Sequence, residues 1–543
     1  MRYLLLICLF MQLSVFAQHR NENQKRPKLV IGLVVDQMRY DFLYRYANRY
    51  SKKGFSKLLR EGHNCENVFI NYLPSYTGPG HACIYTGSVP ALHGISSNDW
   101  IDRITGSSVY CTQDEKVSNV GGSLKSGRMS PRNMWSSTIT DELRLATNFK
   151  SKVIAISVKD RASILPGGHF ANASYWIDDS LGHFMTSTFY MPELPKWVSE
   201  FNAAAYAKKY MSNDWTTKYP ISTYTQSTHD DNAYEGKFTG ETSTEFPHKL
   251  SHLKSSDIKK TPFGNSIVLD FAKQAIEKEQ LGNRGETDFL CLSFSSPDYV
   301  GHMFGPNSIE IEDTYLRLDE EIADFLAYLD DNIGENNYTL FLTADHGVAH
   351  NPQFLIDHKM PAGFMFASTL KNELNNSLQK EFNYPGLIRE IGENFIWLND
   401  AGVDSSKAER KKIVESVMNI LRYHNEVHFA MDMSQVQQSI VPQSIREMAI
   451  NGFAKNRSGD ILLILKPGWL DAYSKTGTTH GTWNPYDTHI PLVWFGKNIN
   501  AGTTSETVYM TDIAATLASM LEIQMPNACI GKAIPKVYNK DQR

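Results

Sequence analysis

Carboxylate and imidazole side chains follow three of the apolar, strand-like runs of this 543-residue chain. They are Asp36 after residues 29–35, Asp298 and His302 after residues 289–294, and Asp345 and His346 after residues 338–343. A single Asp after a strand is usually a turn former or a helix cap. Three such positions, two of them with a histidine, indicate metal ligands. A further imidazole, His480, stands late in the chain in a Thr-His-Gly sequence.

These ligands divide into two sets of three, namely Asp298, His302 and His480 for one ion and Asp36, Asp345 and His346 for another. Adjacent residues of an extended strand point in different directions, so Asp345 and His346 can share an ion only if the chain turns there. Three protein ligands and one open position are typical of catalytic zinc. The mixture of Asp and His also suits other divalent ions. His489 is the alternative to His480 as the late ligand.

Thr77, in the sequence Ser-Tyr-Thr-Gly-Pro-Gly-His at residues 75–81, is the candidate nucleophile. Pro79 fits the first turn of a helix, and Thr77 just before it would lie where free backbone N–H groups favour an anion. For this segment alone, a plain N-cap threonine is the commoner case. The predicted metal ligands make the nucleophilic role of Thr77 the better interpretation, because coordination to a metal lowers the pKa of a hydroxyl group.

The elements that position these residues are short runs of almost continuous apolar residues, which predict strands covered on both faces. The runs are residues 29–35, 153–157, 289–294, 338–343, 461–465 and 492–495. Amphipathic helices are expected between them, one beginning near Asn307 and another that buries Ile513, Leu517 and Leu521. This alternation predicts an α/β fold with a doubly wound, mostly parallel central sheet, helices on both faces, and the ligand site at the carboxyl ends of the strands.

Two long intervals interrupt the alternation, near residues 162–287 and 352–475. We interpret both as large insertions that cover the site, within one catalytic domain over residues 18–543. The alternative for the second interval is an independent domain, and periodicity does not separate the two possibilities.

The N-terminus predicts export. Arg2, an apolar run over residues 4–15 and a polar stretch after Ala17 indicate a signal peptide at residues 1–17, with an uncleaved anchor as the alternative. A periplasmic or secreted protein with no membrane span in the mature chain is therefore expected. The mature chain keeps five cysteines, an odd number that leaves at least one thiol unpaired within the chain. With 54 basic and 59 acidic residues, the net charge of −5 does not indicate a nucleic-acid-binding module.

Five sequence blocks, in order, resemble the alkaline phosphatase superfamily, and more closely the monomeric exported bacterial alkaline phosphatases of the PafA type. The blocks are Val34–Arg39, Tyr76–His81, Ser157–Arg161, Thr343–Gly347 and Thr479–Gly481. The resemblance covers most of the mature chain. It implies one zinc bound by Asp36, Asp345, His346 and Thr77, and a second bound by Asp298, His302 and His480.

The resemblance also implies that Asn98, Lys159 and Arg161 contact the phosphate of the substrate. Lys159 and Arg161 stand two apart, so in an extended backbone both cations would share a face and reach the same anion. Arg grips two phosphate oxygens, whereas Lys acts as a point charge. A solvated turn after a strand is the usual role of such a Lys-Asp-Arg triplet, and only the resemblance favours the phosphate site.

The expected function is hydrolysis of small phosphate monoesters by an exported, monomeric two-zinc alkaline phosphatase, through a phospho-threonine intermediate and with inorganic phosphate as product. The main alternative is a phosphodiesterase or nucleotide pyrophosphatase with the same metal site; the pair Lys159 and Arg161 argues against it, because a monoester carries more negative charge. A sulfatase would need Cys or Ser in place of Thr77. A zinc-binding or storage protein without catalysis would not explain the nucleophile.

Overall fold

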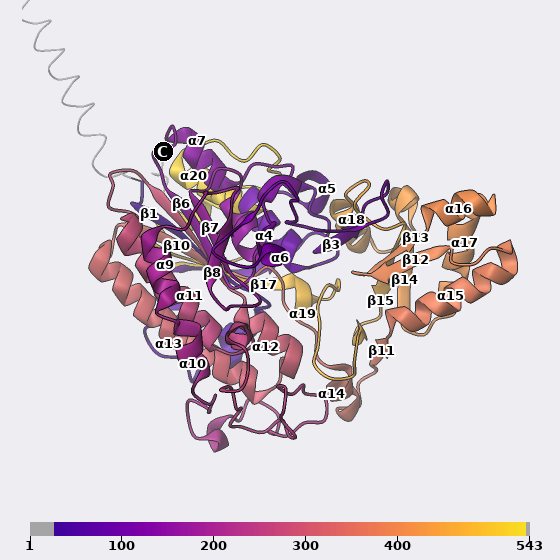
Figure 1. The fold of residues 1–543 in the computed structure, drawn as a ribbon, viewed down its shortest axis with the longest axis horizontal. Coiled ribbons are helices and arrows are strands. Elements are labelled where there is room, and N and C mark those ends of the chain that lie inside the picture. Colours follow the sequence, from indigo (N-terminus) through magenta and orange to yellow (C-terminus); the bar gives the residue numbers. More distant parts are fainter. Residues whose placement is uncertain (1–25, 539–543) are drawn as a thin grey trace, which may run out of the picture.

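The computed structural model describes residues 26–538, so the predicted signal peptide at residues 1–17 lies outside the described residues. Figure 1 shows a large α/β body and a smaller lobe, in orange, at its side. No helix within residues 26–538 combines the length and the apolar character needed to cross a membrane. All five cysteines of this part of the chain are free thiols, which agrees with the odd number that the sequence leaves.

A ten-stranded sheet forms the centre of the main body. In spatial order its strands are β18 (Gly502–Tyr509), β2 (His63–Phe69), β17 (His489–Gly496), β10 (Tyr338–Thr343), β1 (Leu29–Val35), β9 (Asp288–Phe294), β6 (Val153–Ser157), β7 (Ala173–Ile177), β8 (Phe184–Ser187) and β5 (Asn119–Val120). The five neighbours from β10 to β7 are all parallel, and antiparallel pairs lie on both sides of them. The carboxyl ends of these five strands therefore meet at one edge of the sheet.

Helices cover both faces of this sheet (Figure 1), as the sequence predicts. The helices of the main body are α2 (Phe42–Arg45), α3 (Phe55–Glu61), α4 (Thr77–Thr86), α5 (Pro90–His93), α6 (Leu124–Gly127), α7 (Ile139–Ala146), α8 (Arg161–Gly167), α9 (Lys196–Ala203), α10 (Tyr206–Met211), α11 (Phe263–Glu279), α12 (Ser296–Phe304), α13 (Ile309–Asn332), α19 (Pro485–Thr488) and α20 (Asp512–Leu521). The helix expected near Asn307 is α13, and its N-cap is Ser308, whose hydroxyl accepts a hydrogen bond from the backbone N–H of Ile311.

Two aromatic side chains fill the space beside Gly32 of β1. A Cβ atom at Gly32 would lie 2.3 Å from the Tyr85 hydroxyl of α4 and 2.7 Å from the ring of Phe341. A side chain at this position would therefore require Tyr85 and Phe341 to move. Thr77 is the first residue of the same helix, α4.

The interval 162–287 is only partly an insertion. It contributes β7 and β8 to the central sheet, and α11 packs against β6 and β9. Between these elements lie α9, α10 and the long irregular segment of residues 212–262. The sequence does not indicate these two strands because they are short and include polar residues, Ser174 in β7 and Thr186 and Ser187 in β8.

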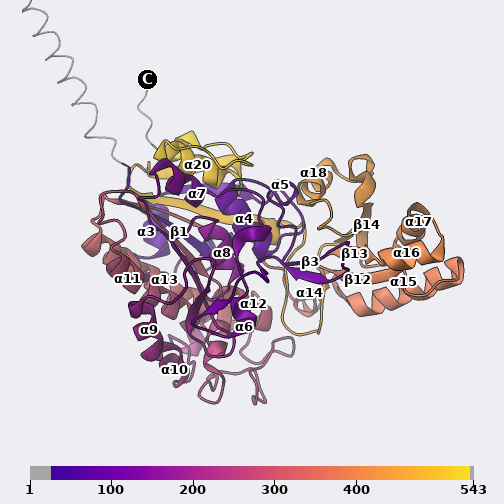
Figure 2. The ribbon, with the colours of Figure 1, turned by 45° about the horizontal axis from the view of Figure 1, so that its top comes forward.

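The interval 352–475 begins with α14 (Pro352–Asp357) and continues as a side lobe, residues 363–471, with a sheet of its own. The elements of the side lobe are β11 (Gly363–Met365), α15 (Ala367–Phe382), β12 (Ile388–Gly392), β13 (Phe395–Leu398), α16 (Asp400–Ser406), α17 (Arg410–Leu421), β14 (Val427–Asp432), α18 (Gln443–Gly452), β15 (Ile461–Leu465) and β16 (Trp469–Asp471). The run 461–465 is therefore a strand, but of the antiparallel sheet β12-β13-β15-β14 and not of the central sheet. Figure 2 shows this lobe beside the main body.

The side lobe shares a hydrophobic cluster with the main body. Trp397 and Leu462 of the lobe pack in one buried cluster with Leu73, Ile95 and Trp100 of the main body. Helices α15 and α17 cover the other face of the lobe's sheet with a cluster that lies within the interval. The lobe is thus anchored to the main body by apolar contacts on one face.

A buried ion network attaches the irregular segment 212–262 to α13. The ring of His248 contacts the Glu241 carboxylate at 3.0 Å and the Glu310 carboxylate, which belongs to α13, at 3.1 Å. Burial by itself would lower the pKa of His248, but the hydrogen bonds with Glu241 and Glu310 outweigh it and raise the pKa to about 9.

This raised pKa predicts a loss of stability at alkaline pH. The folded protein holds the His248 proton more tightly than the unfolded chain does, so the stabilisation is complete below about pH 6.5 and is lost as the pH rises through about 9. His248→Gln is expected to cost roughly 1–3 kcal/mol at pH 7 and to flatten the decline in unfolding free energy between pH 7 and pH 10. Urea unfolding across this range measures the effect, with His229→Gln, at an exposed histidine, as the control. Parallel curves for the native protein and His248→Gln would contradict the assignment.

Candidate active site

The carboxyl ends of four adjacent parallel strands carry the predicted site residues. Asp345 follows β10, Asp36 follows β1, Asp298 lies in the first turn of α12 after β9, and Lys159 follows β6. Strand β1 pairs in register with both β10 and β9, so these strand ends lie side by side. Residues more than 300 positions apart in the sequence therefore meet at one edge of the sheet.

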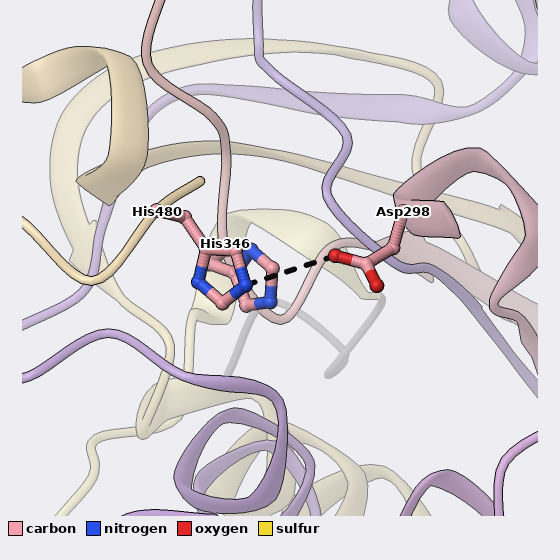
Figure 3. A group of neighbouring side chains, drawn as sticks. All are labelled: Asp298, His346 and His480. Carbon is pink, nitrogen blue, oxygen red and sulfur yellow. Dashed lines mark ion pairs between the residues drawn. The ribbon is translucent and has the colours of Figure 1, made fainter. Parts of the chain in front are cut away.

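Asp298 faces three histidine rings. Its Oδ1 atom lies 3.1 Å from His302 Nε2 and 3.7 Å from His480 Nε2. The rings of His346 and His480 stack at a centroid distance of 3.5 Å, and Figure 3 shows both of them opposite the Asp298 carboxylate. Asp298, His346 and His480 form one group whose ligand atoms are close enough to hold a metal ion.

Asp36, Asp345 and His346 form a second group of this kind. His346 Nε2 lies 3.5 Å from Asp36 Oδ1 and 3.4 Å from Asp345 Oδ2. The chain bends at Asp345 as it leaves β10, which provides the turn that the shared use of Asp345 and His346 requires. The structure thus places His346 next to both groups, whereas the sequence assigned it to one ion only.

The protonation of the three histidines suits metal ligation. In each ring Nδ1 is hydrogen-bonded to a backbone carbonyl, that of Thr478 for His302, of Gly347 for His346 and of Ser75 for His480, at 2.8, 2.9 and 2.9 Å. A carbonyl only accepts, so Nδ1 carries the proton and Nε2 keeps its lone pair. The Nε2 atoms are those that face the carboxylates, and such a second hydrogen bond is what orients a ligating histidine.

The charges of the buried carboxylates also fit bound cations. Asp36 Oδ1 and Asp345 Oδ2 are buried and lack a hydrogen-bond partner within residues 26–538. Burial, followed by repulsion from the Asp298 and Asp345 carboxylates, raises the pKa of Asp36 well above its usual value. A divalent cation would satisfy both oxygens and remove the repulsion. The donors, carboxylate oxygen and imidazole nitrogen, are those that zinc takes.

Lys159 lies between the two groups. Its ammonium contacts Asp36 Oδ2 at 2.8 Å and Asp298 Oδ2 at 2.5 Å. The extended-backbone argument for Lys159 and Arg161 is wrong, because Asp160 between them has helical dihedrals and Arg161 begins α8. Both side chains nevertheless line one cavity of about 200 Å³, together with Tyr110 and others. Lys159 and Arg161 therefore line the same cavity because the chain turns into α8 after β6, and not because they share a face of an extended strand.

Thr77 and Asn98 meet at the start of α4. Thr77 Oγ1 lies 3.3 Å from His346 Nε2. The N-cap residue is Tyr76, so the Thr77 hydroxyl faces the metal ligands and does not cap the helix. The Asn98 side-chain carbonyl accepts a hydrogen bond from the Gly78 N–H at 2.9 Å. This contact leaves the NH₂ of Asn98 pointing away from Gly78, and within residues 26–538 that NH₂ donates to no other group.

Comparison with known proteins identifies the family. The profile of the type I phosphodiesterase / nucleotide pyrophosphatase family matches residues 30–489. The chain belongs to this family. It is 51% identical over 541 residues, or 98% of each chain, to a Myroides odoratus protein named calcium-transporting ATPase. It is 46% identical over 520 residues, or 95% of each chain, to alkaline phosphatase PafA of Elizabethkingia meningoseptica.

The fold agrees with that of a solved relative. The crystal structure of wild-type alkaline phosphatase PafA matches with a TM-score of 0.93 and 46% identity, over 95% of this chain and 99% of that chain. The resemblance stated from the sequence blocks and the α/β fold with a mostly parallel central sheet are both confirmed.

Gln37, which was not predicted from the sequence, contacts two of the predicted ligands. Gln37, at a left-handed φ of 69°, donates from its backbone N–H to Asp345 Oδ1 at 3.2 Å and from its side chain to Asp298 Oδ1 at 2.7 Å. Only its position next to Asp36 could have drawn attention to it.

His489, the alternative late ligand, points elsewhere. Its Nε2 donates a hydrogen bond to the Glu66 carbonyl, and its ring stacks on Tyr40, so the preference for His480 is consistent with the structure.

The shared position of His346 leads to a prediction about metal binding. His346→Ala is expected to weaken zinc affinity by about 10-fold or more and to lower the metal-to-protein ratio further than His302→Ala, because His302 contacts only the Asp298 group. Elemental analysis after equilibration at limiting zinc measures both ratios. His489→Ala is the control and should keep the native ratio. Equal losses in His302→Ala and His346→Ala would contradict the shared position.

Proposed function

We infer that the chain is an alkaline phosphatase that hydrolyses small phosphate monoesters, with inorganic phosphate as product. The observation that carries this inference is the Thr77 hydroxyl, 3.3 Å from Nε2 of a histidine that belongs to both candidate metal groups. The 46% identity to alkaline phosphatase PafA over nearly the whole chain supports the same activity. A nucleophile beside a metal site is the arrangement that covalent phosphoryl transfer requires.

We propose two zinc ions, one held by Asp36, Asp345, His346 and Thr77 and one by Asp298, His302 and His480, with the His346 ring close enough to the second group for its loss to affect both ions. The lone pairs on Nε2 of the histidines and the unpartnered carboxylate oxygens of Asp36 and Asp345 support these ligand sets. When bound, the ions lower the pKa of the Thr77 hydroxyl and stabilise negative charge on the leaving oxygen.

Thr77 acts as the nucleophile in this proposal. Its Oγ1 forms a bond to phosphorus as the bond between phosphorus and the ester oxygen breaks, which releases the alcohol and leaves a phospho-threonine. Attack by water then cleaves the new bond, releases inorganic phosphate and restores the threonine hydroxyl. The start of α4 favours the phosphorylated state, because the positive end of the helix dipole lies at Thr77 and attracts an anion.

Asn98, Lys159 and Arg161 bind the non-bridging phosphate oxygens in this proposal. The NH₂ of Asn98, whose carbonyl is held at Gly78, and the cations of Lys159 and Arg161, which line one cavity, supply the donors for these oxygens. A structure titled as a PafA variant carries substitutions of a threonine, an asparagine, a lysine and an arginine, the same four residue types. A monoester dianion carries one more charge than a diester, so two cations favour the monoesterase over a phosphodiesterase.

We also propose that the protein is exported and acts as a monomer in the periplasm or outside the cell. The apolar run at residues 4–15 and the polar residues after Ala17 support cleavage of a signal peptide. N-terminal sequencing of the mature protein and its mass in solution test the two statements.

Replacement of the nucleophile tests the covalent scheme. Thr77→Ala removes the only atom that can form the phospho-enzyme and is expected to lower kcat/KM for an aryl phosphate monoester by about 10³-fold or more. Thr77→Ser keeps a hydroxyl group and is the matched control. Acid quench with a labelled monoester should trap phosphate on the native protein and on Thr77→Ser only. Full turnover by Thr77→Ala would refute the scheme.

Removal of Arg161 tests the charge argument. Arg161→Ala is expected to lower kcat/KM for a monoester by roughly 10²-fold and to affect the matching diester much less, because the diester lacks the additional charge. Paired initial rates on an aryl monoester and its diester measure the ratio. Arg128→Ala removes an exposed arginine paired with Glu115 and should leave both rates unchanged. An equal loss on the two substrates would show that Arg161 does not select monoesters.

A further inference from the structure

The turn between β12 and β13 is a part of the side lobe that contacts the candidate active site. Gly392 pairs with Phe395, so Glu393 and Asn394 form a two-residue hairpin loop. In both views β12 and β13 lie beside β3 (Asp99–Ile101), the strand that begins directly after Asn98 (Figures 1 and 2). The loop thus reaches the phosphate-binding side of the site from an element almost 300 residues away in the sequence.

The Glu393 carboxylate holds the backbone at Asn98. Its Oε2 atom accepts hydrogen bonds from the Asn98 backbone N–H, at 3.1 Å, and from the Ser97 hydroxyl. The Asn98 side chain in turn accepts from the Gly78 N–H, next to Thr77. A continuous series of hydrogen bonds therefore connects Glu393 with the start of α4. Burial, followed by repulsion from the Asp99 carboxylate, raises the pKa of Glu393 to about 8, so the charged form, which makes stronger hydrogen bonds than a neutral group, prevails above that pH.

The other residue of the loop, Asn394, contacts the segment that carries His480. The side-chain NH₂ of Asn394 donates to the Gly481 carbonyl at 2.7 Å, one residue after His480. The loop therefore contacts both the Asn98 segment and the His480 segment.

The backbone conformation of the loop does not by itself favour a glutamate at position 393. Both loop residues have positive φ, 52° for Glu393 and 61° for Asn394. Two-residue hairpin loops of this kind prefer Asn, Asp or Gly, and a glutamate at the first position is disfavoured locally. Asn394 fits the preference, whereas Glu393 does not. The turn alone does not explain a glutamate there, but its hydrogen bonds with Ser97 and Asn98 do.

We propose that Glu393 is a positioning residue of the phosphatase reaction, which orients Asn98 so that its NH₂ group faces the phosphate. This rests on the proposed function, specifically on the role of Asn98. The side lobe then completes the phosphate site of the main body in addition to packing beside it.

The test uses substitutions that suit the turn. Glu393→Asn and Glu393→Gly fit the left-handed backbone, so the melting temperature should not fall. Both are expected to lower kcat/KM for an aryl phosphate monoester about 10-fold and to weaken inhibition by inorganic phosphate. Glu393→Gln keeps an acceptor oxygen for the Asn98 N–H and should retain most of the activity. Glu390→Gln, at an exposed glutamate of β12, is the control.

A double-mutant cycle separates positioning from a merely structural role. If Glu393 acts through Asn98, Asn98→Ala combined with Glu393→Asn should have the same kcat/KM as Asn98→Ala alone. Additive losses would overturn the inference, as would native activity in Glu393→Asn. A loss in Asn98→Ala without any loss in Glu393→Asn overturns the inference only, whereas native activity in Asn98→Ala overturns it together with the Asn98 role in the proposed function.

Discussion

Three carboxylates buried at the edge of a parallel sheet are the constraint on which the site depends. Asp36, Asp298 and Asp345 reach this edge from three neighbouring strands, and Lys159 neutralises only part of their charge. Unpaired charges are costly to bury, so such a group persists in proteins when cations and hydrogen bonds compensate it. The imidazoles of His346 and His480, each fixed by a carbonyl at Nδ1, lie in the same candidate metal groups and would supply neutral ligands there. The chemistry of the protein follows from this concentration of charge.

The sheet and its covering helices hold this arrangement together. In-register pairing of β1 with β9 and β10 brings the strand ends side by side, and α4 places Thr77 beside His346. Gln37 then connects Asp345 with Asp298 by two hydrogen bonds. Because protein interiors are close-packed, a shift of any one of these elements would move the others.

The two candidate metal groups do not distinguish a monoesterase from a diesterase, because either enzyme could use the same ligands. The family profile, which carries the phosphodiesterase name, and the relatives named alkaline phosphatase therefore agree with each other. What differs between the two activities is the set of groups around the non-bridging oxygens. In the proposed function these groups are Asn98, Lys159 and Arg161, and the side lobe contacts the first of them through Glu393.

The sequence by itself determined four of the five strands of the parallel core, β10, β1, β9 and β6, and the residue types at their ends, because continuous apolar runs and Asp or His after a strand are local patterns. It also indicated Thr77 and the helix that follows. Only the tertiary structure decided that residues 461–465 join a separate sheet, that His346 lies between both metal groups, and that a turn brings Lys159 and Arg161 together. Glu393 could not be found from the sequence either. Periodicity reports whether a residue is buried, but a contact between residues almost 300 positions apart depends on which elements pack together, and no local pattern records that choice.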